Sequence, residues 1–579
     1  RNGAADIAAV TAAARRAFGA QLDGVTNVAA EAHGGADAVN VLTVALWAFA
    51  AIAAAAGAVT LAIVLSRDVA QSEHDQETLA ALGLVRRERV ATVGGRVLLI
   101  AFGGALVAAV LAIAMSPLFP VGIARRAEPS PGLRVDGLVL GVGLVAVIAF
   151  VILVGTVAAL RATRHPFRIE EPAIRGGRRT IADRAAEAGL RPPVTSGVRM
   201  ALEPGRGPSA LPVRSAYFGA VFGVIGLTAA IVFGASLAHL DATPKLYGYT
   251  WDFKAPDDTF AVRCTGNDFG VSHQPGIRAV SAVCYEQVAV DGHPTMGWSF
   301  TPVRGSIGPE VVEGRAPSGP REVALGASTL DALGKKIGDS VRASGNAGSA
   351  TYQIVGRIVL PEMQLGDAQP LADGAAFTGA GGHRLLDNDA TRYIVGTIAP
   401  GAHRATVLHR VNAMPQFRAP AGESNFVFDE GVSGSLRPPE VDRLRNIGWV
   451  PPLVAALVAV LALVAIAHTL TTTTRRRRRD LAVLRALGFE RRQVRATLAW
   501  QATTIAAVGL VVGIPLGVVV GSVVWRRVAE SIGVTATPDY PTVTLLLIVP
   551  AVLLLVNLVG LWPSSAAARR PPALALTAE

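Results

Sequence analysis

Seven long apolar stretches divide this chain of 579 residues, and they constrain its fold more than any other feature. A helix that crosses a bilayer needs about 20 mostly apolar residues. The stretches that qualify are 39–65, 97–118, 137–160, 215–238, 450–469, 498–524 and 542–562. Charged residues are nearly absent within them and make up only 17% of the chain, whereas a soluble protein carries roughly 25%. The sequence therefore predicts a membrane α-helical bundle.

The distribution of arginine predicts the orientation of these spans. Segment 161–214 carries eleven arginines and segment 470–497 carries nine, whereas loops 119–136 and 525–541 carry three and two. Arginine-rich connections stay in the cytoplasm. We therefore expect 66–96, 161–214, 470–497 and the C-terminal tail on the cytoplasmic side. The same clustering beside apolar runs explains the net charge of +11 without a nucleic-acid partner.

The alternation of sides places residues 1–37 outside, although no apolar stretch precedes them and the sequence starts at Arg1. We expect these residues to be the remnant of a first extracytoplasmic domain that follows a missing first helix. The intact protein would then have eight spans, of which seven are visible.

An internal repeat relates the two ends of the chain. A shift of 405 residues aligns 74–166 with 479–571 without a gap, so that Leu79-Ala-Ala-Leu-Gly83 meets Leu484-Arg-Ala-Leu-Gly488. Paired arginines, an intrahelical glycine and an Arg-x-Pro end match at the same offset. These matches carry more weight than apolar identities, because apolar residues coincide often between spans. The chain therefore contains two copies of one three-helix module.

The repeat and the composition together predict the domain organisation. The modules are 38–166 and 449–571, and each reads as helix, cytoplasmic segment, helix, outer loop and helix. An Arg-rich cytoplasmic linker (167–214) and a transmembrane stalk helix (215–239) lead to an extracytoplasmic domain (240–448), and 572–579 form a cytoplasmic tail. Within 240–448, short β-like runs alternate with turns and helical pieces such as 327–334, which predicts a mixed α/β domain.

The cytoplasmic segment of the second module carries the most specific motif. Leu481, Leu484, Leu487 and Val494 recur at near-helical spacing among charges, and Gly488 is suited to end a short helix. The run from Arg475 to Val494 resembles the segment after the second helix of FtsX-like permeases, and the resemblance covers the three helices that follow or flank it, at 450–571. The copy at 40–166 is similar but enters through the acidic run Glu73-His-Asp-Gln-Glu77, where the second copy is basic.

This resemblance implies a permease subunit of an ABC system in the bacterial plasma (inner) membrane. In the family, this segment meets a separate cytoplasmic ATPase, so the resemblance implies an ABC ATPase dimer as partner and a second permease chain as a further one. The alternative to an ATPase contact is that the arginines of this segment only anchor the helix at the membrane surface and fix its topology. The residues that the resemblance implies for ATPase coupling are Leu79, Leu82, Gly83, Arg86, Asp480, Leu484, Leu487, Gly488 and Arg491.

The chain has no G-x-x-x-x-G-K-[ST] motif for a nucleotide of its own, so we expect no cofactor, with ATP bound by the partner subunit. Neither a metal-ligand cluster nor a nucleophile elbow is apparent, and we expect no catalytic residues and no enzyme.

The extracytoplasmic domain offers a weaker resemblance and two cysteines. The stretch from Glu313 to Gly356 resembles the periplasmic core domain of MacB-like permeases. Cys264 and Cys284 lie in the same domain, where a disulfide would persist, although two free buried thiols are the alternative.

The resemblance leaves two functions open. Family members of the mechanical kind export or extract a lipid, a peptide or a drug-like substrate, with membrane lipid as a further partner. The alternative is an FtsX-like regulator that activates a cell-wall enzyme, although such regulators usually have a single four-helix unit. Spans without paired carboxylates or lysine argue against a proton-coupled pump.

Overall fold

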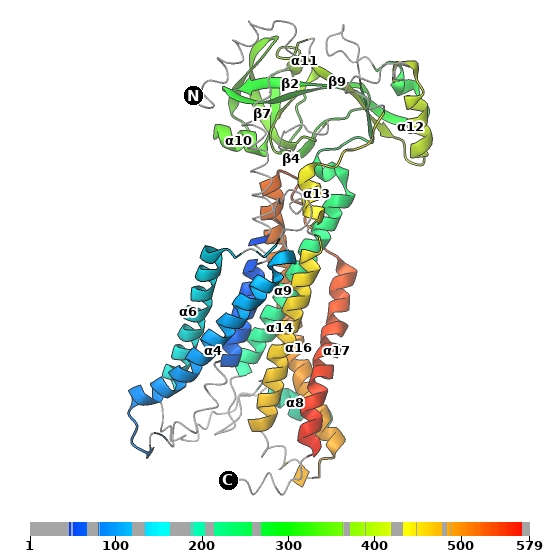
Figure 1. Ribbon diagram of the computed structural model, residues 1–579. Coiled ribbons are helices and arrows are strands. Elements are labelled where there is room, and N and C mark those ends of the chain that lie inside the picture. Colours follow the sequence, from blue (N-terminus) through cyan, green and yellow to red (C-terminus); the bar gives the residue numbers. More distant parts are fainter. Residues whose placement is uncertain are drawn as a thin grey trace. The chain divides into compact units, whose positions relative to one another are not determined.

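A computed structural model describes most of the chain, and Figure 1 shows its elements along the sequence. The described residues are 46–47, 50–65, 79, 81–118, 132–133, 135–162, 184, 187, 189–202, 213–256, 268–361, 363, 371–387, 390–417, 432–446, 448–476, 483, 485–486 and 488–569. They divide into two compact units. One unit contains the described parts of 236–445 and 525–538 and holds the β-sheet; the other contains those of 47–235, 446–524 and 539–579 and holds most of the apolar helices.

Six helices of the described part are long and apolar enough to cross a membrane, at Arg87–Met115, Gly137–Leu160, Tyr217–Ala242, Pro439–Thr471, Arg491–Ile532 and Thr542–Leu561. They confirm six of the seven predicted spans as helices. A shorter apolar helix, Ala50–Leu65, lies where the first span was predicted. Residues 39–45 and 48–49 lie outside the described residues, so the seventh span stays a prediction.

The membrane helices extend beyond the apolar stretches that predicted them. They are α4 (Arg86–Met115), α6 (Gly137–Ala162), α9 (Val213–Ala242), α14 (Val450–Arg476), α16 (Arg491–Ile532) and α17 (Thr542–Arg569), and the short η3 (Ser116–Leu118) follows α4. The predicted outer loop 525–541 is helical as far as Ile532. Trp525, Val528, Ala529 and Ile532 are buried, and their i, i+3, i+4, i+7 spacing continues one apolar face of α16 into an otherwise polar stretch.

Within the described part of the linker 167–214, residues Pro192–Leu202 form the helix α8. Two prolines suit its first turn because the N–H groups there have no intrahelical partner. Gly197, Met200 and Ala201 are buried, whereas Arg199 is exposed. The linker was predicted only as an Arg-rich connection, so this amphipathic helix is a structural addition to that prediction.

The sheet unit is built on a mixed sheet of nine strands. Their order is β1-β9-β2-β3-β8-β5-β7-β4, and β6 pairs with β2 and β7. Pairs β3/β8 and β5/β7 are parallel and the remaining pairs are antiparallel. The strands are β1 (Phe253–Pro256), β2 (Ile277–Val290), β3 (His293–Arg304), β4 (Glu310–Gly314), β5 (Glu322–Gly326), β6 (Ser340–Gly345), β7 (Gly348–Val359), β8 (Ala375–Thr378) and β9 (Thr391–Ile398). This region is the mixed α/β domain expected after the stalk.

Short helices connect these strands, and apolar clusters fill the sheet unit. The helices are η5 (Pro244–Tyr247), η6 (Val271–His273), α10 (Ala327–Leu333), α11 (Gly379–Gly382), α12 (Arg404–Asn412), η7 (Pro415–Phe417) and α13 (Pro439–Asn446). One cluster centres on Val323, Leu325 and Phe377, and another on Phe253, Val280 and Ile394. Cys284 is buried in the first cluster and is disulfide-bonded. Cys264 lies outside the described residues, so the pairing of these two cysteines stays a prediction.

Candidate coupling site

In the described parts of the two predicted cytoplasmic segments, the same glycine turn recurs 405 residues apart. Gly83 and Gly488 both adopt left-handed backbone, with φ of +87° and +98°. Such a conformation favours glycine at the end of a helix. A long membrane helix then begins three residues later in each module, α4 at Arg86 and α16 at Arg491. The repeated Leu-Gly therefore encodes the same turn in both copies.

Matching caps fix the start of these two helices. The backbone N–H of Val85 donates to Glu88 Oε2 at 3.0 Å, and the backbone N–H of Glu490 donates to Gln493 Oε1 at 2.9 Å. In each case the side chain at the third helical position accepts from the residue before the helix, which is half of a capping box. Glu88 and Gln493 are equivalent under the 405-residue shift, so the chain enters both helices in the same way.

The predicted coupling residues are distributed unevenly over the described part of the chain. Leu79 is half-buried, whereas Leu82 is 72% exposed and Gly83 and Gly488 are exposed as well. Arg491 is exposed on the first turn of α16; for Arg86 only the backbone is described. Asp480, Leu484 and Leu487 lie outside the described residues. An apolar side chain as exposed as Leu82 is available to a partner, and nothing in the structure assigns that partner.

Both modules bury one i, i+4 stripe of the helix that follows the segment. In α4 the stripe is Arg89, Val93, Val97, Ala101 and Ala105, and in α16 it is Val494, Leu498, Ala502, Ala506 and Leu510; all ten residues are buried. Residues four apart lie on one face of a helix. The two stripes correspond position by position under the 405-residue shift, but they begin with an arginine in one module and a valine in the other.

Helix α8 covers the start of the stripe in the second module. Met200 packs against Val494 and Phe489. A Cβ added at Gly197 would lie 2.5 Å from the carbonyl oxygen of Thr497 and 2.7 Å from Trp500 Cβ. Only glycine allows backbones to approach so closely. Sequence reasoning missed these contacts, although Gly197, Met200 and Ala201 recur at helical spacing after two prolines.

Glycine also sets the contact between α9 and α16. Gly509, Gly513, Gly517 and Gly521 recur every four residues on α16, and a Cβ added at any of them would lie 2.6–2.9 Å from an atom of α9. On its other side, α9 brings Gly223 and Gly226 against Ala462 and Val458 of α14. Small residues spaced by four let membrane helices pack backbone to backbone. The described stalk helix is therefore held between the first two helices of the second module.

The end of α9 is joined to the segment before α13 within the sheet unit. Arg437, which precedes α13, forms an ion pair with Asp241 at the end of α9, with Nε 2.9 Å from Oδ1. From η5 onward, buried aromatic rings succeed one another at centroid distances of 4.9–6.4 Å through Tyr247, Tyr249, Trp251, Phe300, Trp298, Tyr285 and Tyr393. Such contacts stabilise a rigid junction between the end of the stalk and strands β2, β3 and β9.

The last turns of α16 belong to the same unit as the sheet. Trp525 is fully buried, and its Nε1 donates to the carbonyl oxygen of Thr537 at 3.1 Å. The N–H of Thr535 donates to the carbonyl oxygen of Leu246 at 2.9 Å. Gly533 has φ +74°, and an added Cβ would lie 2.2 Å from Ala372 Cβ. The turn after α16 is therefore fitted closely to the sheet unit.

The sequences of the two modules match the model of one known protein family. The model of the family described as FtsX-like permease C-terminal matches residues 47–167 and 452–572. Each of the two modules therefore contains a domain similar to the C-terminal domain of FtsX-like permeases. Each bound of the second match lies 405 residues after the corresponding bound of the first, which is the shift that the internal repeat predicted.

Two relatives of the chain are named ABC transporter permeases. An uncharacterized ABC transporter permease of Mycobacterium tuberculosis is 26% identical over 266 residues, 45% of this chain and 67% of that protein. An uncharacterized ABC transporter permease of Mycobacterium bovis is 28% identical over 214 residues, 37% of this chain and 52% of that protein. With its apolar helices, the permease is a multi-pass protein of the bacterial inner membrane.

Proposed function

We propose that this permease couples ATP hydrolysis by a separate ABC ATPase dimer to a conformational change of its sheet domain. The cargo class is a lipid, a peptide or a drug-like molecule that is exported or extracted at the outer face. ATP is bound by the partner subunit. The two cytoplasmic segments, 79–86 and 480–491, each contact one ATPase subunit, and the extracytoplasmic domain is 240–448.

The single observation that carries this proposal is the matching geometry of the two segments. A left-handed glycine, a capped helix start and a buried i, i+4 stripe recur at one fixed offset. A dimeric ATPase presents two equivalent surfaces, and two equivalent segments on one chain fit that symmetry. If the segments served only to anchor the helices, they would need basic residues at the membrane interface. They would need neither the glycine turn nor the exposed Leu82.

Helix α16 offers the route for the conformational change. It is one continuous helix of 42 residues that begins at Arg491, next to the second segment, and its last turns belong to the sheet unit. Its glycine contacts with α9 are close-packed, so a displacement of one helix would move the other. The ion pair Arg437–Asp241 and the aromatic rings would pass this motion from the stalks to the sheet.

The alternative function is regulation of a cell-wall enzyme by the sheet domain, without transport. It uses the same ATPase contact and the same stalks. The duplicated module favours transport, because regulators of this family usually carry a single unit. Cells that lack the permease separate the two functions: retention of an envelope lipid or peptide supports transport, whereas lowered peptidoglycan hydrolysis supports regulation.

The test of coupling introduces a charge into each segment. Leu82→Asp and Leu487→Asp are expected to abolish co-purification of the ATPase with the tagged permease, or to lower the ATP hydrolysis of the complex at least tenfold. Ile337→Asp is the matched control, because Ile337 is an exposed apolar residue of the sheet unit. Binding and hydrolysis that stay at the wild-type level in both segment variants would refute the coupling proposal.

A further inference from the structure

The buried stripe of α4 begins with an arginine, Arg89, whose buried Nε and Nη1 atoms have no hydrogen-bond partner among the described residues. Arg89 is only 6% exposed. A buried cation is costly unless an anion or hydrogen-bond acceptors pair with it. The equivalent residue of the second module is Val494, which Met200 covers. The first module therefore has a cationic position where the second has an apolar contact.

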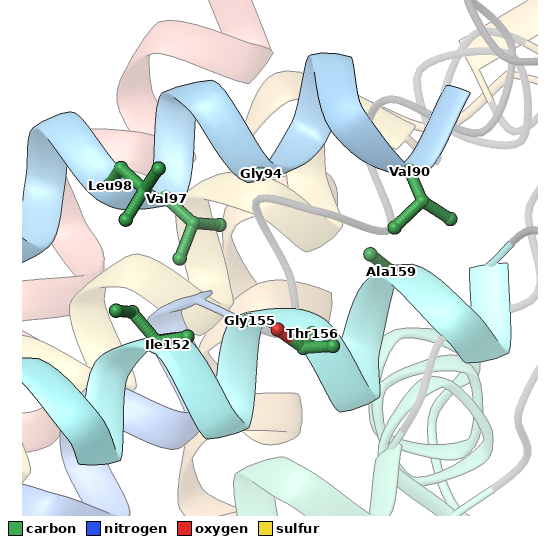
Figure 2. Close-up of a pocket in the computed structure, with 8 residues that line it drawn as sticks. All are labelled: Val90, Gly94, Val97, Leu98, Ile152, Gly155, Thr156 and Ala159. Carbon is green, nitrogen blue, oxygen red and sulfur yellow. The ribbon is translucent and has the colours of Figure 1, made fainter. Parts of the chain in front are cut away.

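An apolar cavity lies between α4 and α6, and its lining begins at Val90, the residue that follows Arg89 in the chain. Its volume is about 210 Å³, and it is lined by Val90, Gly94, Val97, Leu98, Ile152, Gly155, Thr156 and Ala159. Figure 2 shows Val90 facing Ala159 at one end and Val97 beside Ile152 and Gly155 further along. Only Thr156 among these residues has a polar side chain. Water needs two to four polar partners in a buried site, so the cavity favours an apolar occupant.

The arginine and the cavity lie on consecutive turns of the same helix. Val90 follows Arg89 directly, and Val97 belongs both to the buried stripe and to the cavity lining. Arg89 stands in the first turn of α4, at the end that the arginine distribution assigns to the cytoplasm, which is the depth of lipid headgroups. The span windows of α4 and α6 are only 17% and 6% buried, so bilayer lipid reaches both helices from the side.

We infer that this place binds an anionic phospholipid of the cytoplasmic leaflet. The phosphate accepts hydrogen bonds from Nε and Nη1 of Arg89, a geometry that suits guanidinium, and an acyl chain occupies the cavity between α4 and α6. A protein carboxylate would satisfy the arginine but would leave the cavity empty, whereas one lipid satisfies both. The site belongs to the first module only, because Asn557 and Thr503, the equivalents of Ile152 and Leu98, form an interhelical hydrogen bond of 3.0 Å.

The experiment uses the full chain, purified in detergent and depleted of lipid. Phosphatidylglycerol or phosphatidylcholine is added back; native mass spectrometry measures retained lipid, and thermal unfolding measures stabilisation. Wild type is expected to retain phosphatidylglycerol and to melt at a higher temperature with it than with phosphatidylcholine. Arg89→Gln is expected to weaken phosphatidylglycerol retention at least tenfold. Arg87→Gln is the matched control, because Arg87 is exposed in the same turn.

A second variant and a third additive keep the outcome decisive if Arg89→Gln does not fold. Gly94→Leu fills the cavity and leaves Arg89 in place, since nothing lies within 4 Å of an added Cβ there; it is expected to lose retained phosphatidylglycerol. Inorganic phosphate is expected to give no stabilisation. Equal effects of the two lipids, equal retention by the two arginine variants, or stabilisation by phosphate alone would each overturn the inference. So would an Arg89→Gln melting temperature that falls equally in both lipids, which indicates a protein carboxylate.

Discussion

The duplication supplies an internal control for the glycine contact between α9 and α16. Gly509 and Gly104 are equivalent positions of the two modules, each within a membrane helix. A Cβ added at Gly509 would lie 2.9 Å from Ala220 Cβ and 3.2 Å from its carbonyl carbon, whereas nothing lies within 4 Å of a Cβ added at Gly104. The same substitution, glycine to alanine, therefore meets a neighbouring backbone in one module and open space in the other.

The expected difference follows from these distances. Carbon atoms pack best at about 3.5–4.0 Å, so Gly509→Ala forces α9 and α16 apart by roughly 0.6–1 Å. Overpacking of this kind costs about 1–3 kcal/mol. Both variants also gain up to about 1 kcal/mol from the higher helix propensity of alanine, and this gain cancels when the two are compared. Gly509→Ala should thus be less stable than Gly104→Ala by about 1–3 kcal/mol.

The assay is thermal unfolding of the two variants in the same detergent, followed by far-UV circular dichroism. At roughly 2–4 °C per kcal/mol, the melting temperatures should differ by roughly 2–12 °C, with Gly104→Ala at or above wild type. Gly517→Ala extends the series, since its Cβ would lie 2.6 Å from Thr228 Cβ and 2.8 Å from the carbonyl oxygen of Ile225; it should lose at least as much. Equal melting temperatures for Gly104→Ala and Gly509→Ala would refute the close-packed interface.

Three further variants test other parts of the structure. Gly197→Ala should release α8 from α16, at a cost of about 1–3 kcal/mol, and should therefore expose the α8 backbone to limited proteolysis. Arg191→Ala, at an exposed residue directly before α8, should leave the cleavage rate unchanged. Arg437→Gln removes the ion pair with Asp241, and because both side chains are about one third exposed, unfolding measurements should show a loss of no more than about 1 kcal/mol; a larger loss contradicts a solvent-screened pair. The hydrogen bonds from Arg315, Ser318 and Gly319 hold the pKa of the Glu322 carboxyl below its ordinary value, so its stabilisation is present above the unfolded pKa and is lost as the pH falls through the folded pKa. The melting temperature of Glu322→Gln should therefore fall less than that of wild type between pH 7 and pH 3. The difference should be small because the side chain is accessible to solvent. Curves of melting temperature against pH that run parallel below pH 7 for the two proteins would contradict this assignment.

The spans and the repeat were predictable from sequence because both depend on local patterns. A stretch of apolar residues identifies a membrane helix wherever its neighbours lie, and Gly83 and Gly488 mark a turn that the backbone requires. The ends of the helices were less predictable. Helix α16 continues to Ile532 although Arg526, Arg527 and Glu530 interrupt its hydropathy, because the buried side of that stretch is supplied by tertiary contacts.

The contacts around the coupling segment were not predictable, because they join residues distant in sequence. Nothing in the composition of 167–214 indicates that Gly197 meets α16, and the arginines that surround α8 conceal its short apolar face. The burial of Arg89 was not predictable for the same reason. In the sequence it stands among the arginines of a cytoplasmic connection, and only the packing of α4 separates it from exposed Arg87.

The two modules share their local structure and differ in what covers them. In the second module, α9 fills the glycine stripe of α16, and α8 covers Val494. The equivalent stripe of α4 is Gly104, Ala108, Ala112 and Ser116; its residues are small as well, but the first three are exposed within the described part of the chain. Under the proposed coupling, two similar cytoplasmic segments would therefore act on helix bundles that are covered differently. The same displacement would move α9 and the end of α16 that belongs to the sheet unit in the second module. In the first module it would act on the helices α4 and α6, where Arg89 has no hydrogen-bond partner for Nε and Nη1 among the described residues. If the proposed coupling holds, the second module would transmit the movement and the first would respond to the bilayer.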